Sequence, residues 1–178
     1  MKILIVVDMQ NDFIDGALGS PEAQAIVPKV SEKIWQYYNN GDKILYTADT
    51  HFEDNYFRTI EGQKLPVLHC IHGTKGWEIP ASLYVPNSPI VTKTTFGCWD
   101  LGNRLQAMIG PRAEYESIEI VGLCTDICVI NNTMIIKSWF ENTPIIVDAS
   151  CCAGVTPESH KNALAAMKMC HIEVVNED

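Results

Sequence analysis

The feature that most constrains the fold is a series of short, continuously apolar runs rich in Val and Ile. These runs do not alternate between polar and apolar residues. Strands formed from them would therefore have both faces covered, as the strands of a parallel sheet do. We predict strands at 2–7, 43–48, 89–92, 117–122, 144–148 and 171–175.

Stretches with helical periodicity separate these runs. The last one has clear start signals, with Thr156 as N-cap, Pro157 at the first helical position and Glu158 in the first turn. Alternating strands and helices predict an α/β fold, a three-layer α/β/α sandwich around a mostly parallel, Rossmann-like sheet of about six strands. The predicted helices cover 28–38, 100–109, 126–140 and 157–169.

The length of 178 residues predicts a single domain over 1–178, because domains average roughly 150 residues. The stretch from about 50 to 89 is different from the rest. It contains several His and Gly residues and has no sustained period. A segment of this length inside a compact domain is typical of a functional loop or lid.

The charge balance excludes some partners. Thirteen Lys and Arg against twenty-two Asp and Glu give a net charge of −9, with no basic run. We therefore expect neither a nucleic-acid partner nor a membrane surface. No apolar run approaches the roughly 20 residues of a membrane span, and the run Ile3–Val7 is too short for a signal peptide. We expect a cytoplasmic protein.

The cysteines and the outer aromatic residues leave two further points. Seven cysteines without a C-x2-C pair are expected to be mostly free, buried thiols of a reducing compartment. The predicted outer helices carry large apolar residues that either form the interface of a homo-oligomer or pack against the sheet. These residues are Trp35, Tyr37, Tyr38, Trp139 and Phe140.

Chemically active side chains stand where the predicted strands end. Asp8, Asp49 and Lys93 follow the first three strands, and Cys124 and Cys128 follow the fourth. In open parallel sheets ligands bind beyond the carboxyl ends of the strands. We therefore expect a carboxylate, a lysine, two thiols and a pair of metal-ligand residues, Asp49 and His51, to converge at one edge of the sheet.

Cys128 falls in the first turn of the helix that opens near Asp126. Helix N-terminal N–H groups and the ammonium of Lys93 would lower the pKa of this thiol, and Asp8 would take its proton. The backbone N–H groups of Cys124 and Cys128 would form an oxyanion hole. The alternatives are a core role for Cys128, Cys124 as the nucleophile, Asp8 as a turn cap and Lys93 as a strand-end lysine with its head in solvent.

Asp49 and His51 are two residues apart, so on an extended segment their side chains lie on one face. An Asp/His pair suits zinc, manganese or iron. A further ligand would come from the following loop, where His69, His72 and Glu61 are candidates. The alternative is a solvated loop without a metal.

Several motifs, taken together and in order along nearly the whole chain, resemble the isochorismatase-like cysteine hydrolases and, among them, the nicotinamidases most. The segments that carry the resemblance are 8–13 (DMQNDF), 49–51 (DTH), 69–70 (HC) with 73–76 (GTKG), 93–94 (KT), 122–129 (GLCTDICV) and 152–156 (CAGVT).

This resemblance implies a role for each matching catalytic residue. Asp8 would be the base, Lys93 its electrostatic partner and Cys128 the nucleophile. A cis peptide would precede the oxyanion-hole residue, at the Leu123–Cys124 bond. The implied reaction converts nicotinamide to nicotinate and ammonia through a thioester.

The resemblance also implies a metal. Asp49, His51 and His69 match the nicotinamidase ligands, with Glu61 as an approximate fourth. One divalent ion is expected there, zinc first, with manganese or iron as alternatives. It would bind the pyridine nitrogen of the substrate and orient the amide toward the thiol.

The predicted substrate pocket includes two departures from the family pattern. Phe13 matches a substrate-packing position, and Phe96 or Trp99 would supply a second aromatic wall. Leu123 and Ile127 complete the predicted pocket, but Ile127 stands where the family often has Tyr or His. Segment 66–68 (PVL) replaces the aromatic residue that often precedes the metal histidine. For all of these residues the alternative is core packing.

Other readings compete with the nicotinamidase. Isochorismatases proper lack a nucleophilic cysteine, so Cys128 disfavours isochorismate. A related amidase or ureidohydrolase would keep the catalytic residues but generally lacks the metal ligands. A thiol redox protein would use Cys124 with Cys128, or Cys151 with Cys152. Adjacent cysteines form strained bridges and i, i+4 pairs rarely meet disulfide geometry, which disfavours that reading.

Overall fold

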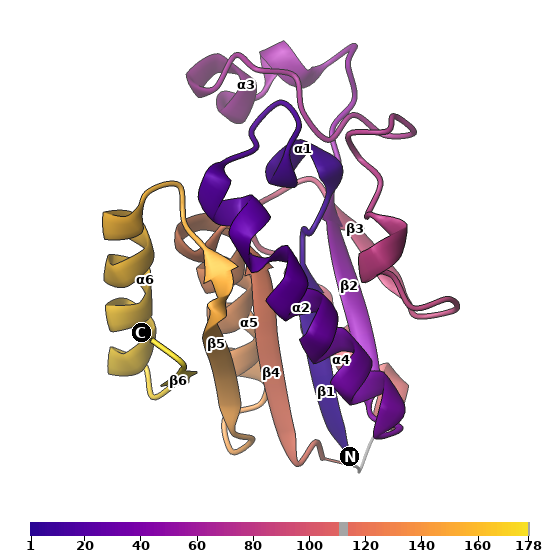
Figure 1. Cartoon of the computed structure of the whole chain (residues 1–178), viewed down its shortest axis with the longest axis vertical. Coiled ribbons are helices and arrows are strands. Elements are labelled where there is room, and N and C mark those ends of the chain that lie inside the picture. The colour runs from indigo at the N-terminus through magenta and orange to yellow at the C-terminus, as the bar shows by residue number, and fades with distance from the viewer. Residues whose placement is uncertain (111–113, 178) are drawn as a thin grey trace.

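The computed structural model describes residues 1–110 and 114–177. Within them, six parallel strands form one sheet in the order β3-β2-β1-β4-β5-β6 (Figure 1), which confirms the predicted fold class. The strands are β1 Lys2–Val7, β2 Lys43–Asp49, β3 Ile90–Lys93, β4 Ser117–Leu123, β5 Ile145–Ala153 and β6 Glu173–Val175.

The register of four neighbouring strands, from the edge strand β3 to β4, sets up the site. Asp49 at the end of β2 pairs with Lys93 at the end of β3, and Val7 pairs with Thr47 on one side and Gly122 on the other. The carboxyl ends of β3, β2, β1 and β4 therefore reach the same edge of the sheet, at the top of Figure 1.

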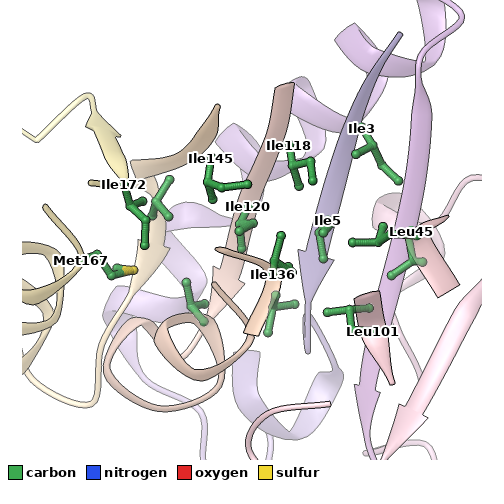
Figure 2. Packing of buried hydrophobic residues seen from close by; sticks show 14 of the residues in the cluster. Ile3, Ile5, Leu45, Leu101, Ile118, Ile120, Ile136, Ile145, Met167 and Ile172 are labelled. Carbon is green, nitrogen blue, oxygen red and sulfur yellow. The ribbon is translucent and has the colours of Figure 1, made fainter. Parts of the chain in front are cut away.

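Helices cover both faces of the sheet. α1 (Asn11–Ile14) and α2 (Pro21–Asn39) pack on one face, and α4 (Leu101–Ile109), α5 (Ile130–Trp139) and α6 (Pro157–Met169) on the other. Successive residues of a strand point to opposite faces, so Ile3 and Ile5 face α4 and α5, whereas Leu4 and Val6 face α2. Figure 2 shows the first of these two cores, with residues from strands and helices interdigitating: Ile3, Ile5, Leu45, Leu101, Ile118, Ile120, Ile136, Ile145, Met167 and Ile172.

The predicted start of the first long helix at residue 28 is wrong. α2 begins at Pro21, where Ser20 is the N-cap and its Oγ accepts a hydrogen bond from Ala23 N at 3.0 Å. Pro28 lies inside the helix on its exposed side. A proline ring fits the first helical position, so Pro21 and Pro28 could each begin a helix. The helix begins at Pro21 because Ser20 caps it there.

Three other boundaries differ from the prediction. β5 continues from 148 to Ala153, because the polar Asp148 stays inside the sandwich, paired with Lys33 of α2 at 2.8 Å. β6 begins at Glu173, after a turn in which His171 has a φ of +60°. The predicted helix over 126–140 is split into a π-helical turn, η3 (Thr125–Val129), and α5.

The long stretch from about 50 to 89 contains only short elements, as a loop would. They are η1 (Tyr56–Arg58), α3 (Ile60–Lys64) and η2 (Ala81–Leu83). An isolated bridge between His51 and Ile71 closes the first part of the loop on itself. Among the residues that the structure describes, no helix is both long and apolar enough to cross a membrane.

Candidate active site and metal centre

Lys93 is at the centre of a buried group of reactive side chains. Its Nζ lies 2.7 Å from Asp8 Oδ2, 3.5 Å from Cys128 Sγ and 3.3 Å from Asp49 Oδ1. Asp8, Lys93 and Cys128 each expose 4% or less of their surface. The structure thus brings together the three predicted catalytic residues and one predicted metal ligand.

The backbone and Thr47 orient Asp8. Asp8 follows β1 directly and has a φ of +48°, a conformation that few residues other than glycine adopt. Thr47 Oγ1 donates a hydrogen bond of 2.6 Å to Asp8 Oδ1. The other oxygen, Oδ2, is therefore directed at Lys93 and makes no further hydrogen bond within the described residues. This is the oxygen that can accept a proton.

The electrostatics differ from the prediction of a low thiol pKa. Burial and the carboxylate of Asp8 raise the pKa of Cys128, and Lys93 only partly offsets them. Burial likewise raises the pKa of Asp8, against the lowering effect of Lys93. A buried thiol beside a carboxylate keeps its proton until the carboxylate takes it. The site is thus arranged for proton transfer rather than for a permanent thiolate.

A distorted turn at residues 124–129, hereafter the nucleophile turn, carries Cys128. It follows a cis peptide bond between Leu123 and Cys124, which confirms the expected position of that bond. Gly122 before it has a φ of +123°, and a Cβ there would collide with the carbonyl oxygen of Val7. The carbonyl of Cys124 accepts hydrogen bonds of 3.0 Å from both Ile127 N and Val129 N.

Asn132, one helical turn after Cys128, was missed in the sequence. Its Nδ2 donates to Cys128 O at 2.8 Å and to Phe96 O at 3.1 Å, and its Oδ1 accepts from Cys98 N at 2.8 Å. Asn132 is fully buried. It ties the nucleophile turn to the segment after β3 that follows Lys93.

A second group lies on the other side of Lys93. One ligand atom from each of Asp49, His51, Glu61 and His69 falls within 4.8 Å of the others. His51 Nε2 is 2.9 Å from Asp49 Oδ2 and 3.6 Å from Glu61 Oε1, and His69 Nε2 is 3.7 Å and 3.5 Å from the same two oxygens. Tetrahedral zinc bonds of about 2.0–2.1 Å place ligand atoms about 3.3 Å apart. The four residues therefore fit a divalent metal.

Local structure directs these ligands inward. His51 N donates to Cys70 O at 3.0 Å, which holds the two histidine segments side by side. The Nδ1 of His69 bonds Val67 O at 2.9 Å, so its Nε2 faces the group. Glu61 sits in the first turn of α3, which Thr59 caps. His72, an alternative ligand, lies outside the group and is exposed.

The pKa values show which charge the group prefers. Burial lowers the pKa of His51 and His69, but hydrogen bonds to Asp49 and Glu61 outweigh it and raise each pKa to about 9. Burial raises the pKa of Glu61, but the two histidines lower it to about 2. The carboxylates thus stabilise positive charge at this point, which a metal cation would supply.

Residues of segment 8–13 support both groups in ways that the sequence did not reveal. Gln10 Oε1 accepts from Asp49 N at 2.7 Å, while its Nε2 donates to Asp49 O at 2.9 Å and to Trp77 O at 2.8 Å. Asp12 Oδ2 accepts from Cys70 N at 2.7 Å, next to His69. This segment therefore fixes the backbone of two ligands.

The predicted pocket residues are dispersed. The ring of Phe13 lies 5.6 Å from that of His69, beside the metal group. Ile127 is half-buried on the nucleophile turn, and Leu123 is fully buried in the core. Phe96 and Trp99 are exposed by 43% and 76%, so the structure does not bring them into a closed wall.

The cysteine pairs considered for redox chemistry are unpaired. All seven cysteines are free. Cys151 and Cys152 belong to opposite faces of β5 and to different cores, so their side chains point away from each other. Burial raises the pKa of Cys124 to about 12, as it also raises that of Cys128, but Cys128 is the thiol that lies 3.5 Å from Lys93 Nζ.

Comparison with known proteins assigns the family. The model of the isochorismatase domain matches residues 2–177. The chain belongs to the isochorismatase domain family. This family assignment agrees with the resemblance seen in the motifs.

Individual relatives cover nearly the whole chain. The nicotinamidase of Schizosaccharomyces pombe is 27% identical over an alignment of 207 residues, which covers 98% of this chain and 92% of that protein. A pyrazinamidase of Pyrococcus horikoshii, solved in complex with zinc, is 28% identical with a TM-score of 0.83 and covers 98% of both chains. A pyrazinamidase/nicotinamidase of Streptococcus mutans is 26% identical with a TM-score of 0.84, covering 98% of this chain and 100% of that one.

Proposed function

We propose that this chain is a metal-assisted cysteine amidohydrolase that converts nicotinamide and water to nicotinate and ammonia. The observation that carries the proposal is the position of Lys93, between the Asp8–Cys128 pair and Asp49 of the metal group. A thiol with an adjacent base can attack a carbonyl, and an adjacent metal group can hold a ring nitrogen. The relatives that act on nicotinamide or pyrazinamide support this substrate class.

The first half of the reaction forms a thioester. Asp8 Oδ2 removes the proton of Cys128, and Lys93 stabilises the thiolate. The sulfur attacks the amide carbon, and the carbonyl oxygen becomes an oxyanion that the N–H groups of Cys124 and Cys128 stabilise. When the intermediate collapses, the C–N bond breaks and Asp8 returns its proton to the nitrogen, which leaves as ammonia.

The second half releases the acid. Asp8 removes a proton from water, whose oxygen attacks the thioester carbon. The C–S bond then breaks, the thiol regains its proton from Asp8, and the product leaves as the acid, which releases its proton to solvent and becomes nicotinate. Asp8 thus acts in turn as base and acid, which suits the raised pKa of this carboxyl.

Asp49, His51, Glu61 and His69 would hold the metal, for which we propose zinc. When bound, the ion would supply a Lewis-acidic contact for the ring nitrogen of the substrate. Phe13 would pack beside the ring, since it already lies against His69. We propose that 1–178 acts as one domain, in which the loop at about 50–89 supplies three of the four ligands.

The test is ammonia release from nicotinamide after addition of zinc, manganese or iron. We expect release by the wild type and by Cys170→Ala, which removes an exposed cysteine, and a loss of about 10⁴-fold or more in Cys128→Ala. Benzamide, which lacks the ring nitrogen, should react much more slowly. Equal rates on both amides would contradict the metal's role, and an active Cys128→Ala would contradict the nucleophile.

A further inference from the structure

The nucleophile turn contacts α6 and the segment just before it through two side chains that take no part in the chemistry above. Thr125 Oγ1 shares a hydrogen bond of 2.7 Å with His160 Nδ1. The carboxylate of Asp126 accepts from Val155 N at 3.1 and 3.3 Å. Thr125 is fully buried. The turn is therefore connected to the start of α6, just as Asn132 connects it to the segment after β3.

His160 is held firmly in the first turns of α6. A capping box between Thr156 and Ser159 fixes the start of this helix. The backbone of Gly154 is so close that a Cβ there would come within 2.9 Å of His160 Cβ. Burial lowers the pKa of His160 and so favours the neutral ring; a neutral imidazole has one donor and one acceptor, which suits a bond to a hydroxyl.

We propose that His160 is a positioning residue for the amide hydrolysis, acting through Thr125 to hold the nucleophile turn against Asp8 and Lys93. The inference rests on the proposed function, because it concerns the same thiol. Thr125 lies between Cys124 and Cys128, which supply the oxyanion hole and the nucleophile. A shift of about 1 Å in reacting groups can cost about 10²-fold in rate, so a bond to this turn affects turnover without touching substrate.

Replacement of His160 separates positioning from stability. A single neutral hydrogen bond contributes little to folding, and α6 is anchored independently by its cap and by Leu164 and Met167 in the core. We therefore expect His160→Ala to lower kcat about tenfold with KM within about twofold. Its melting temperature should fall by no more than about 4 °C.

The conservative variants give the decisive contrast. An asparagine at 160 places an amide atom where Nδ1 lies, whereas a glutamine reaches to the Nε2 position. His160→Asn should recover most of kcat, and His160→Gln should remain as slow as His160→Ala. Asn162→Ala, at an exposed position of the same helix, is the control and should match the wild type. Full kcat in His160→Ala, or an asparagine variant as slow as the glutamine variant, would overturn the proposal.

Two further measurements keep the test decisive. Thr125→Val should slow turnover as His160→Ala does, and the double variant should be little slower than either single variant. If the two losses multiplied, the two residues would not act through the same contact.

The second measurement is the rate at which iodoacetamide alkylates Cys128, located by peptide mass spectrometry, and it needs no substrate. If the wild type releases no ammonia from nicotinamide, the proposed function fails. An alkylation rate changed by His160→Ala and restored by His160→Asn would then still support the positioning role, and an unchanged rate would refute it.

Discussion

The molecule contains two buried clusters in which one lysine faces two carboxylates, and they differ in how completely their atoms are paired. Lys93 contacts Asp8 and Asp49 at 2.7 and 3.3 Å. Lys33 contacts Glu119 and Asp148 at 2.6 and 2.8 Å. In each cluster the lysine and the two carboxylates come from three different segments of the chain.

The Lys33 cluster is saturated with hydrogen bonds. Tyr37 OH donates to Glu119 at 2.6 Å, and Asp148 accepts from both the backbone and the hydroxyl of Ser150 and from Asn176. In the Lys93 cluster, Asp8 Oδ2 has no partner besides the lysine among the described residues, and the thiol of Cys128 lies 3.5 Å from the same lysine. A fully paired network stabilises a structure, whereas an incomplete one leaves an atom that can exchange a proton.

The largest effect is expected when Lys93 is replaced. Lys93→Met removes the charge that stabilises the thiolate, so kcat for ammonia release should fall about 10³-fold. Circular dichroism should show a folded protein. A variant that keeps more than a tenth of the wild-type rate would mean that the two clusters do not differ in function.

Lys33→Met should lower stability while leaving turnover nearly unchanged. It leaves Glu119 and Asp148 buried without a counter-charge, which should reduce the free energy of unfolding by about 3 kcal/mol. Urea titration measures this loss, and kcat of the folded fraction should change less than about threefold. Lys29→Met, at an exposed position of α2, should leave both quantities unchanged. A large loss of kcat at constant stability would show that the Lys33 cluster also serves the reaction.

Metal removal should affect one cluster only. A chelator should abolish activity and lower the melting temperature, because a ligand present at 100 times its Kd stabilises the fold by about 2.7 kcal/mol. Zinc should restore both. His51→Ala should remove this response, and His72→Ala, an exposed histidine of the same loop, should keep it. The response in Lys33→Met should equal that of the wild type.

The smallest expected effect concerns the free energy of unfolding at acidic pH. Burial would raise the pKa of Asp148, but hydrogen bonds from Lys33 and Ser150 hold it below its usual value. A carboxyl with a lowered pKa stabilises the fold above its ordinary pKa, and this stability is lost as the pH falls through the folded value. Asp148→Asn should therefore flatten the loss of stability in acid.

Asp8 provides the control for this measurement. Its pKa is raised, so its contribution has the opposite sign and is lost as the pH rises. Asp8→Asn should therefore make the acid limb steeper than in the wild type. Urea titrations between pH 3 and 7 compare the three proteins, and equal slopes for Asp148→Asn and the wild type would contradict the assignment.

The sequence predicted the sheet well, because both faces of the inner strands β1, β2 and β4 are covered and these strands are rich in apolar residues. The sequence predicted the ends of strands less well where a polar residue lies inside the strand and is buried. Asp148 looked like the end of a strand because its partner, Lys33, is 115 positions earlier in the chain. Such pairing is invisible until the fold brings the two residues together.

The same reason explains which site residues were found. Asp8, Asp49, Lys93 and Cys128 were predicted because they stand at strand ends, which meet at one edge. Gln10, Thr47, Asn132 and His160 were missed, because each acts through a partner distant in sequence. The pKa of Cys128 was predicted with the wrong sign, since the sequence shows a neighbouring lysine but not the depth of burial.

The strand order β3-β2-β1-β4 has a consequence for how the protein could be monitored during refolding. Each of these four neighbouring strands ends next to one reactive group, and the groups are spread over residues 8 to 128 of the chain. No half of the sheet contains the whole set. Recovered ammonia release would therefore report that these four neighbouring strands are all in register. Fluorescence of an exposed tryptophan such as Trp99 would report only on its own surroundings.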